Sequence, residues 1–275
     1  LDVAGARAVP AAAWAVALVR AGTFCFLVIF LVALRLLHRL GLLWTMGEPF
    51  LQAMFMWIVF AFLFGSTKGI AQQPFIIYVI TGLLPLGWLT SSISGGPKVL
   101  RRYGDLLVTS KLPAVVWPMR LVLFSFADMI LALPVVAALA IAFHIFTGEP
   151  GISWGIALVP VAILFQFFLC LGFAMIGAAL AVHFPDVERM TSLLNRFFFW
   201  MSPVLWSQRN FPDWITPYLY LNPFHGILDF YRAAFFPDVL SHWTNYVISF
   251  TVVLIVFVVG LVLMRSRTSE IRRLF

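Results

Sequence analysis

The chain has 275 residues, of which 63% are hydrophobic and 11% are charged, and its formal net charge is +7 at pH 7. This composition lies far outside the range of soluble domains, so we expect an integral membrane protein. A nucleic-acid partner is excluded because it would need a basic soluble domain, which this composition does not indicate. The positive charge is expected to serve membrane topology and contact with anionic membrane lipids.

Six windows are long and apolar enough to suggest membrane spans, for which about 20 mainly apolar residues are needed. They are residues 49–66, 74–95, 118–146, 154–182, 190–206 and 244–264. Backbone groups in lipid must be hydrogen-bonded within their own segment, and these windows lack the alternation of barrel strands. We therefore predict an all-α integral membrane protein with six transmembrane helices.

The distribution of basic residues predicts the orientation. If both termini and the loops at 98–120 and 183–196 face the cytoplasm, all but three of the 18 basic residues lie on that side. The exceptions are Lys68, Arg209 and Arg232. This bias predicts an even number of spans, both termini cytoplasmic, and a multi-pass protein of the cytoplasmic (inner) membrane.

The N-terminal region divides into a tail (1–19) and a segment (20–43) with a short apolar body at 24–34. Arg35, His38 and Arg39 follow on one helical face, which predicts an amphipathic helix lying on the cytoplasmic leaflet. The alternative is a seventh span from about Ala11 to Leu34, with Arg20 inside it and the N-terminus outside. The transmembrane domain is expected to occupy residues 44–275.

The first two spans contain prolines. Glu48-Pro49 is expected to open the first span at its cytoplasmic end, since proline at a first-turn position loses no hydrogen bond. Thr81-Gly82 and Leu84-Pro85 predict a kink or break in the second span.

A charged inner loop at 98–117 follows the second span. Asp105 can cap a short helix that Pro113 ends, which would make a knob on which a partner could dock. A loop whose basic residues only enforce topology is the alternative, and the composition does not separate the two.

The third and fourth spans carry distinctive small and polar residues. Asp128 is a functional candidate because acids at membrane depth are costly, although nearby Ser125 favours a structural hydrogen bond. The fourth span has small residues that would let a neighbouring helix approach closely. They are Gly172, Ala174, Gly177 and Ala178.

The segment from Asp186 to Pro237 is the most unusual part of the chain. Its first helix is expected to stop at Ser202-Pro203, and Pro212, Pro217 and Pro223 then break the chain into short pieces. In NPFHGILDFYR (222–232), Asp229 and Arg232 are close enough to pair. We expect amphipathic, re-entrant helices that dip into the outer leaflet.

No catalytic or metal-binding motif is found. GxSxG and HExxH are absent, and the five histidines are scattered without ligand spacing. The phosphate-binding motif G-x-x-x-x-G-K-[ST] is also absent. We therefore expect no catalytic residue, no metal and no cofactor in this chain, and energy for any uphill transport would come from a partner.

Several motifs in fixed order resemble the transmembrane subunit of ABC-2 type polysaccharide exporters, which include O-antigen, teichoic acid and galactan permeases. They are GLLWTMGEPFLQ (41–52), TGLLPLGWL (81–89), KLPAVVWP (111–118), DVERMTSLLNRFFFWMSPVLW (186–206) and NPFHGILDFYR (222–232). The similarity runs from about residue 20 to residue 275. The chain departs from many relatives in having fewer basic residues before the first span.

The resemblance implies a homodimer bound to two ABC ATPase subunits, which carry ATP and Mg, and a lipid-linked polysaccharide as the cargo. It implies a coupling helix at Leu106–Leu112, where Asp105, Leu106, Leu107 and Lys111 would contact the ATPase. It also implies outer-gate helices at 211–237. Their candidate residues are Asn222, Pro223, Asp229, Tyr231 and Arg232.

The first and fifth spans would line the export path in such a protein. The candidate wall residues are Met54, Trp57, Phe60, Phe197, Phe199 and Trp200, whose rings could stack on sugars; packing against lipid or other helices is the alternative. A lipid-linked glycan carries a pyrophosphate, which needs cationic donors at the inner leaflet. The candidates there are Arg35, Arg39, Arg101 and Arg102.

Two other functions compete with glycan export. An ABC-2 exporter of a lipid or drug would share the architecture and differ only in cargo. A membrane-embedded sugar transferase would need converging carboxylates, whereas the acidic residues here are dispersed along the chain.

Overall fold

The structure is a computed structural model that describes residues 47–48, 50–59, 75–104, 112–147, 151–208, 211–212 and 214–267, apart from the side chains of Val135 and Phe143. These residues belong to one unit, Trp44–Phe275. The other unit, Leu1–Leu43, lies outside the described residues. The predicted tail and interfacial helix therefore lie outside them as well.

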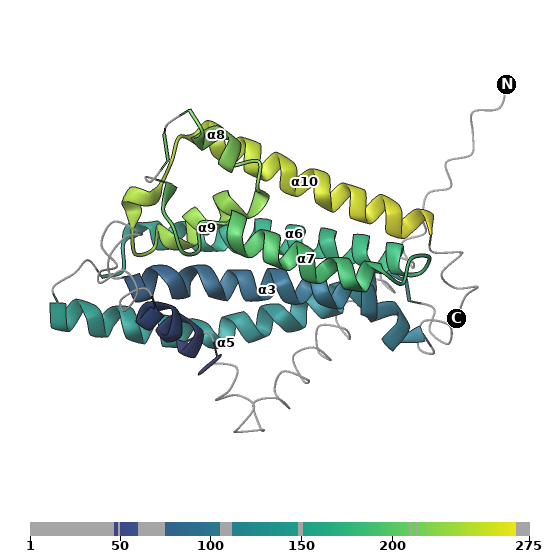
Figure 1. Cartoon of the computed structure of the whole chain (residues 1–275), viewed down its shortest axis with the longest axis horizontal. Coiled ribbons are helices and arrows are strands. Elements are labelled where there is room, and N and C mark those ends of the chain that lie inside the picture. Colours follow the sequence, from purple (N-terminus) through teal and green to yellow (C-terminus); the bar gives the residue numbers. More distant parts are fainter. Residues whose placement is uncertain are drawn as a thin grey trace, which may run out of the picture. The chain divides into compact units, whose positions relative to one another are not determined.

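Among the described residues, four helices are long and apolar enough to cross a membrane. They are α3 (Phe75–Arg102), α5 (Val116–Thr147), α6 (Val159–Ala181) with its preceding 3₁₀ turn η1 (Trp154–Leu158), and α10 (Trp243–Ser266) (Figure 1). They coincide with the second, third, fourth and sixth apolar windows. No strand occurs among the described residues, and the predicted all-helical class is confirmed.

The first and fifth windows form shorter helices. Phe50–Val59 is helical, and the rest of the first window lies outside the described residues. Helix α7 (Val187–Met201) has 15 residues and is therefore about 22 Å long, shorter than a hydrocarbon core of about 30 Å. It ends where expected, because Ser202 is extended (φ −93°, ψ 146°) before Pro203. The fifth span predicted at 190–206 is therefore not confirmed and remains a prediction.

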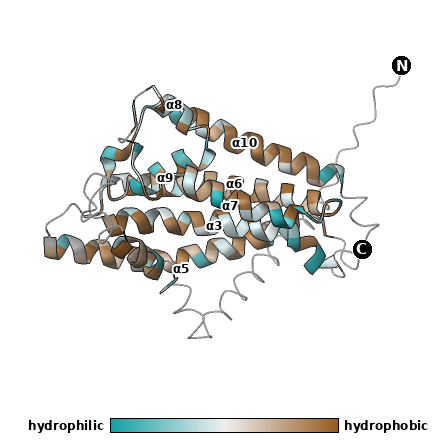
Figure 2. Ribbon diagram, in the orientation of Figure 1, coloured by the Kyte–Doolittle hydropathy of each residue, from teal (hydrophilic) through white to brown (hydrophobic). Residues whose placement is uncertain are grey.

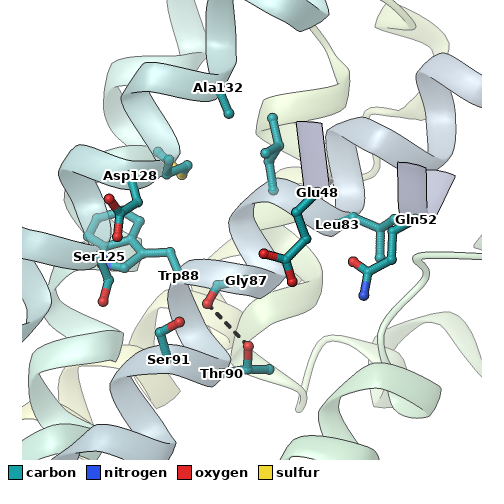
Figure 3. A pocket seen from close by; sticks show the side chains of 12 residues that line it. Glu48, Gln52, Leu83, Gly87, Trp88, Thr90, Ser91, Ser125, Asp128 and Ala132 are labelled. Atoms are coloured by element: carbon teal, nitrogen blue, oxygen red, sulfur yellow. Dashed lines mark hydrogen bonds between the residues drawn. The ribbon is translucent and has the colours of Figure 1, made fainter. Parts of the chain in front are cut away.

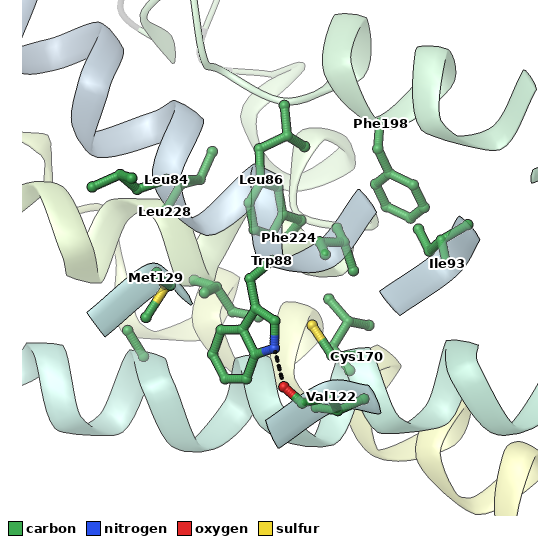
Figure 4. Close-up of a cluster of buried hydrophobic side chains, with 14 of the residues drawn as sticks. Leu84, Leu86, Trp88, Ile93, Val122, Met129, Cys170, Phe198, Phe224 and Leu228 are labelled. Carbon is green, nitrogen blue, oxygen red and sulfur yellow. Dashed lines mark hydrogen bonds between the residues drawn. The ribbon is translucent and has the colours of Figure 1, made fainter. Parts of the chain in front are cut away.

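Helix α3 is the most buried of the long helices and packs against α5, α6 and α7. It continues through Pro85 and Pro97, so of the predicted kink or break the break does not occur. Neighbouring side chains support the helix there: Gln166 Nε2 donates to the Pro85 carbonyl at 2.6 Å, and the Thr81 hydroxyl donates to the Ile77 carbonyl at 2.8 Å. Trp88 Nε1 likewise donates to the Val122 carbonyl of α5 at 3.0 Å (Figure 4).

Small residues set the closest helix contacts. A Cβ on Gly260 would lie 2.5 Å from the Gly172 carbonyl oxygen, so α6 and α10 meet backbone to backbone. A Cβ on Gly177 would lie 2.8 Å from Pro97 Cδ of α3, and Ala174 is buried against Gly96. The predicted role of these residues in close helix packing is confirmed. Cys170, in the same region, is free and fully buried, as expected of a packing residue.

The outer surfaces of the long helices are apolar. Helix α10 is hydrophobic along most of its length, and hydrophilic residues appear near its C-terminal end (Figure 2). Its exposed side chains include Val247, Leu254, Ile255 and Val258. Because these side chains would be costly to expose to water, this face of α10 is suited to lipid.

Candidate functional site

The segment between α7 and α10 folds over the long helices as short pieces. It contains α8 (Thr216–Leu219), α9 (Pro223–Arg232) and the 3₁₀ turn η3 (Pro237–Val239). All ten residues of α9 are buried, and the helix contacts α3, α6 and α10. Helix α9 has the expected apolar and polar stripes, and protein covers both of them; its re-entry into the outer leaflet remains a prediction.

Asn222 begins α9 and also joins it to α7. Its side-chain oxygen accepts a hydrogen bond from the Phe224 backbone N–H at 3.1 Å, which satisfies one of the free donors at the start of the helix. Its amide nitrogen donates to the Ser202 hydroxyl at 3.0 Å and to the Met201 carbonyl at 3.2 Å. One side chain thus caps the start of α9 and the end of α7.

Arg232 ends α9 and is fully buried. Its guanidinium lies 3.6 Å from the centre of the Tyr78 ring, Nη1 donates to the Tyr78 hydroxyl at 2.9 Å, and Nη2 donates to the Val204 carbonyl at 3.2 Å. Gly82 leaves room for this group, since a Cβ there would lie 2.9 Å from Nη2. The Tyr78 hydroxyl in turn donates to the Trp206 carbonyl at 2.7 Å. Arg232 therefore joins α9, α3 and the turn after α7.

Asp229 has partners of its own. Its carboxylate accepts a hydrogen bond from the Tyr220 hydroxyl and a longer one, at 3.4 Å, from Tyr246. The predicted ion pair of Asp229 with Arg232 is wrong, because each side chain bonds to different tyrosines on different helices. Burial raises the pKa of Asp229 to about 7, against the lowering effect of the Tyr220 hydrogen bond and of Arg232.

His225 lies on the same helix and is fully buried beside the rings of Tyr220 and Trp206. Neither ring nitrogen has a hydrogen-bond partner. Burial, and then the charge of Arg232, lower the pKa of His225 to about 3, so the ring is neutral at pH 7. It acts as an aromatic packing residue. Among the described residues no three metal-ligating side chains come together.

The remaining outer-gate candidates serve packing. Pro223 is buried at the first turn of α9, and its carbonyl accepts from the Ser249 hydroxyl of α10 at 2.8 Å. Tyr231 is buried with its hydroxyl 4.0 Å from the Met129 sulfur of α5. The five predicted residues are thus on one short helix and its cap, yet their partners lie on α3, α5, α10, the end of α7 with its following turn, and the residue that follows α8.

The candidate wall residues lie on two helices. Trp57 is exposed and Met54 half-buried on Phe50–Val59, while Phe60 lies outside the described residues. On α7, Phe197 and Trp200 are exposed and Phe199 is half-buried. Phe197 also lines an apolar groove of about 420 Å³ between α6 and α7. Their role in a path remains a prediction.

At the C-terminal end of α3, Arg101 and Arg102 are exposed. Arg101 forms an ion pair with Glu188 at the start of α7, with 3.2 Å between Nη1 and Oε1. Arg35 and Arg39 lie outside the described residues, as do the coupling candidates Asp105, Leu106, Leu107 and Lys111.

The ends of the coupling loop are held together. Tyr103 stacks on Trp117, with ring centres 5.1 Å apart, and the Arg120 guanidinium lies 4.6 Å from the Tyr103 ring centre. This contact joins the C-terminal end of α3 to the first turn of α5. Sequence reasoning missed it, because the pairing depends on where the two helix ends meet.

Among the described residues, four long apolar helices, of which α6 contacts the other three, define a multi-pass helical membrane protein. The model of the ABC-2 type transporter family matches residues 43–236. The chain belongs to this family.

Curated relatives extend the match over most of the chain. The O-antigen export system permease protein RfbA of Myxococcus xanthus is 30% identical over 72% of this chain and 73% of its own length. A permease of the same name from Klebsiella pneumoniae is 26% identical over 81% of this chain and 82% of its own. The polysialic acid transport protein KpsM of Escherichia coli is 21% identical over 83% and 86%, respectively.

Proposed function

We propose that this chain is the transmembrane subunit of an ATP-driven transporter that exports a lipid-linked polysaccharide across the cytoplasmic membrane. The observation that carries the proposal is the similarity, over about three quarters of both chains, to permeases named for O-antigen and polysialic acid transport. The subunit acts as a homodimer with two ABC ATPases that bind ATP and Mg. Both termini are cytoplasmic.

The inner surface receives the ATPase and the lipid head of the cargo. The coupling helix predicted at Leu106–Leu112 would pass its movement to α3 and α5 through the Tyr103–Trp117–Arg120 contact. The Arg101–Glu188 pair passes it to α7. The exposed Arg102, with Arg35 and Arg39, contacts the pyrophosphate, since guanidinium groups bind phosphate oxygens through charge-assisted hydrogen bonds.

The outer end is closed by α9 and the turn after α7. Phe50–Val59 belongs to the first of six spans, and α7 with its following turn forms the fifth. The Arg232, Tyr78 and Val204 contacts fix α9 to the end of α7, so movement of α7 must displace the short outer helices. This arrangement supports a gate that opens when α7 shifts.

The test is purification of the tagged chain from its native membranes. We expect an ABC ATPase to co-purify and its ATP turnover to depend on this chain, because the chain lacks a nucleotide-binding motif. The variant L106D/L107D should lose the ATPase, whereas Arg189→Ala, on the exposed face of α7, should retain it. A chain that purifies alone with sugar-transferase activity contradicts the proposal.

A further inference from the structure

A polar cleft lies between Phe50–Val59, α3 and α5. Its volume is about 350 Å³, within the range of small-molecule sites. Six polar side chains line it: Glu48, Gln52, Thr90, Ser91, Ser125 and Asp128. Figure 3 shows Glu48 and Asp128 on either side of the cleft, with Thr90 and Ser91 of α3 between them.

The cleft lies at membrane depth. Asp128 is about 18 Å along α5 from Val116, and Gly87 is about 22 Å along α3 from Arg102, at 1.5 Å per residue. Glu48 lines the same cleft, so it lies beside the middle of these spans and not beside their inner ends, where the sequence had placed it. Both acids are therefore within the hydrocarbon region.

The polar side chains of the cleft are accessible. Glu48, Gln52 and Ser91 are exposed, and Thr90, Ser125 and Asp128 are partly exposed. Acids and amides at this depth face a water-filled cavity or a polar occupant, because hydrocarbon offers them no hydrogen bonds. The exposed side chains in the middle of α10 are apolar by contrast, except Thr251, whose hydroxyl bonds the Val247 carbonyl of its own helix, so the cleft marks a face of the protein that does not contact lipid tails.

A polar stripe on α3 leads from the cleft to the inner surface. Gly87, Ser91, Ser94 and Lys98 recur at intervals of three and four residues, which places them along one face of the helix. Asn195 of α7 donates to the Ser94 hydroxyl at 2.6 Å and so borders the stripe. The stripe ends at the exposed Arg101 and Arg102.

We infer that this cleft binds hydroxyl groups of the sugar rings in the exported chain. Carboxylates on two sides accept hydrogen bonds from sugar hydroxyls, while the Gln52 amide and the serine and threonine hydroxyls can both donate and accept. Because a neutral sugar carries no charge, the cleft needs no charged group to balance it. A metal cation fits less well, because the described residues do not gather three metal-ligating side chains. The inference rests on the proposed function, since it names the place where the transporter would hold the exported glycan.

The first test is cysteine accessibility in the complete transporter in native membranes, with Cys25 and Cys170 replaced by serine. The probe is a charged, membrane-impermeant thiosulfonate, applied to inverted vesicles. Ser91→Cys should react at least about tenfold faster than Val258→Cys, which is on the exposed apolar face of α10. Its labelling should fall at least about threefold in membranes whose cells make the glycan, compared with cells blocked in its synthesis.

Slow labelling of Ser91→Cys would overturn the inference, because lipid or a second copy of the chain would then cover the cleft. Labelling that is fast but independent of the glycan would also overturn it, because the cleft would then hold only water.

The second test is export by E48Q/D128N, with Thr251→Val on the exposed face of α10 as the control. The double variant should slow glycan export at least about fivefold while the chain and its ATPase still co-purify, and the control should export normally. Wild-type export that depends on sodium and loses this dependence in the double variant would identify a cation site and refute the inference. If deleting the chain leaves surface glycan intact, the proposed function fails; if deletion abolishes the glycan but E48Q/D128N exports normally, only the cleft inference fails.

Discussion

Replacing Arg232 by alanine is expected to lower the free energy of unfolding by about 3–5 kcal/mol, among the largest effects of any single substitution in the described part of the chain. The guanidinium is fully buried, lies over the Tyr78 ring, and donates to the Tyr78 hydroxyl and the Val204 carbonyl. Its removal leaves these acceptors without a donor and opens a cavity beside Gly82. Lysine should recover part of the stability, since it keeps the charge but cannot donate to both groups in the same plane.

Thermal unfolding of the purified protein in detergent measures this effect. Arg189→Ala is the matched control, because the Arg189 side chain is exposed and its pair with Asp186, at 3.6 Å, lies on the surface. The control should change stability by no more than about 0.5 kcal/mol. An Arg232→Ala melting temperature within about 2 °C of wild type would show that the contacts of Arg232 do not hold α9 in place.

Replacing Gly260 by leucine is expected to separate α6 from α10 and destabilise the protein by about 3 kcal/mol or more. A Cβ at this position would lie 2.5 Å from the Gly172 carbonyl oxygen, and backbone cannot move aside as a flexible side chain can. Because α9 packs against both helices and its Pro223 carbonyl bonds to Ser249 of α10, the short outer helix should loosen as well.

Hydrogen–deuterium exchange together with thermal unfolding would report this change. We expect faster exchange in α9 and a lower melting temperature for Gly260→Leu, with a milder effect for Gly260→Ala. Val258→Leu, two residues away on the exposed face of the same helix, should match wild type. Wild-type behaviour of Gly260→Leu would mean that the two helices do not approach closely at this crossing.

The long helices could be predicted from the sequence because lipid imposes a strict condition on the backbone. Each apolar window that became α3, α5, α6 or α10 had to be helical to satisfy its own N–H and C=O groups. The close contact at Gly172 could also be predicted, since small residues on a spanning helix have few other uses. Helix α3 runs through Pro85 without a break, and the bond that Gln166 of α6 donates to the Pro85 carbonyl could not be predicted from the local pattern.

The burial of α9 could not be predicted from the sequence. Its apolar and polar stripes are those of a surface helix, and nothing within residues 222–232 indicates that Tyr78, 154 positions away from Arg232, covers the polar stripe. The same holds for Asp229, whose partners Tyr220 and Tyr246 lie on either side of it in sequence but give no local pattern. The sequence offers one hint of the Arg232 contact, which is Tyr78, a single tyrosine among the apolar residues that begin α3.

Only one of the two acids that line the polar cleft could be placed correctly from the sequence. The sequence indicates that Asp128 is an acid at membrane depth, but Glu48-Pro49 has the composition of a helix start and so predicts Glu48 at the inner end of its span. The repeat of Gly87, Ser91 and Ser94 on α3 could have indicated a polar face. Which helices lie opposite that face depends on tertiary packing, which the local pattern does not contain.

The most direct test of the proposed function is to deplete this chain and follow the lipid-linked glycan on both sides of the membrane. We predict loss of surface glycan and accumulation of full-length lipid-linked glycan at the inner face, both reversed by the wild-type chain. Surface glycan at its normal level would contradict the proposal. So would loss of the full-length lipid-linked chain with accumulation of a shorter precursor, since that result would identify a transferase.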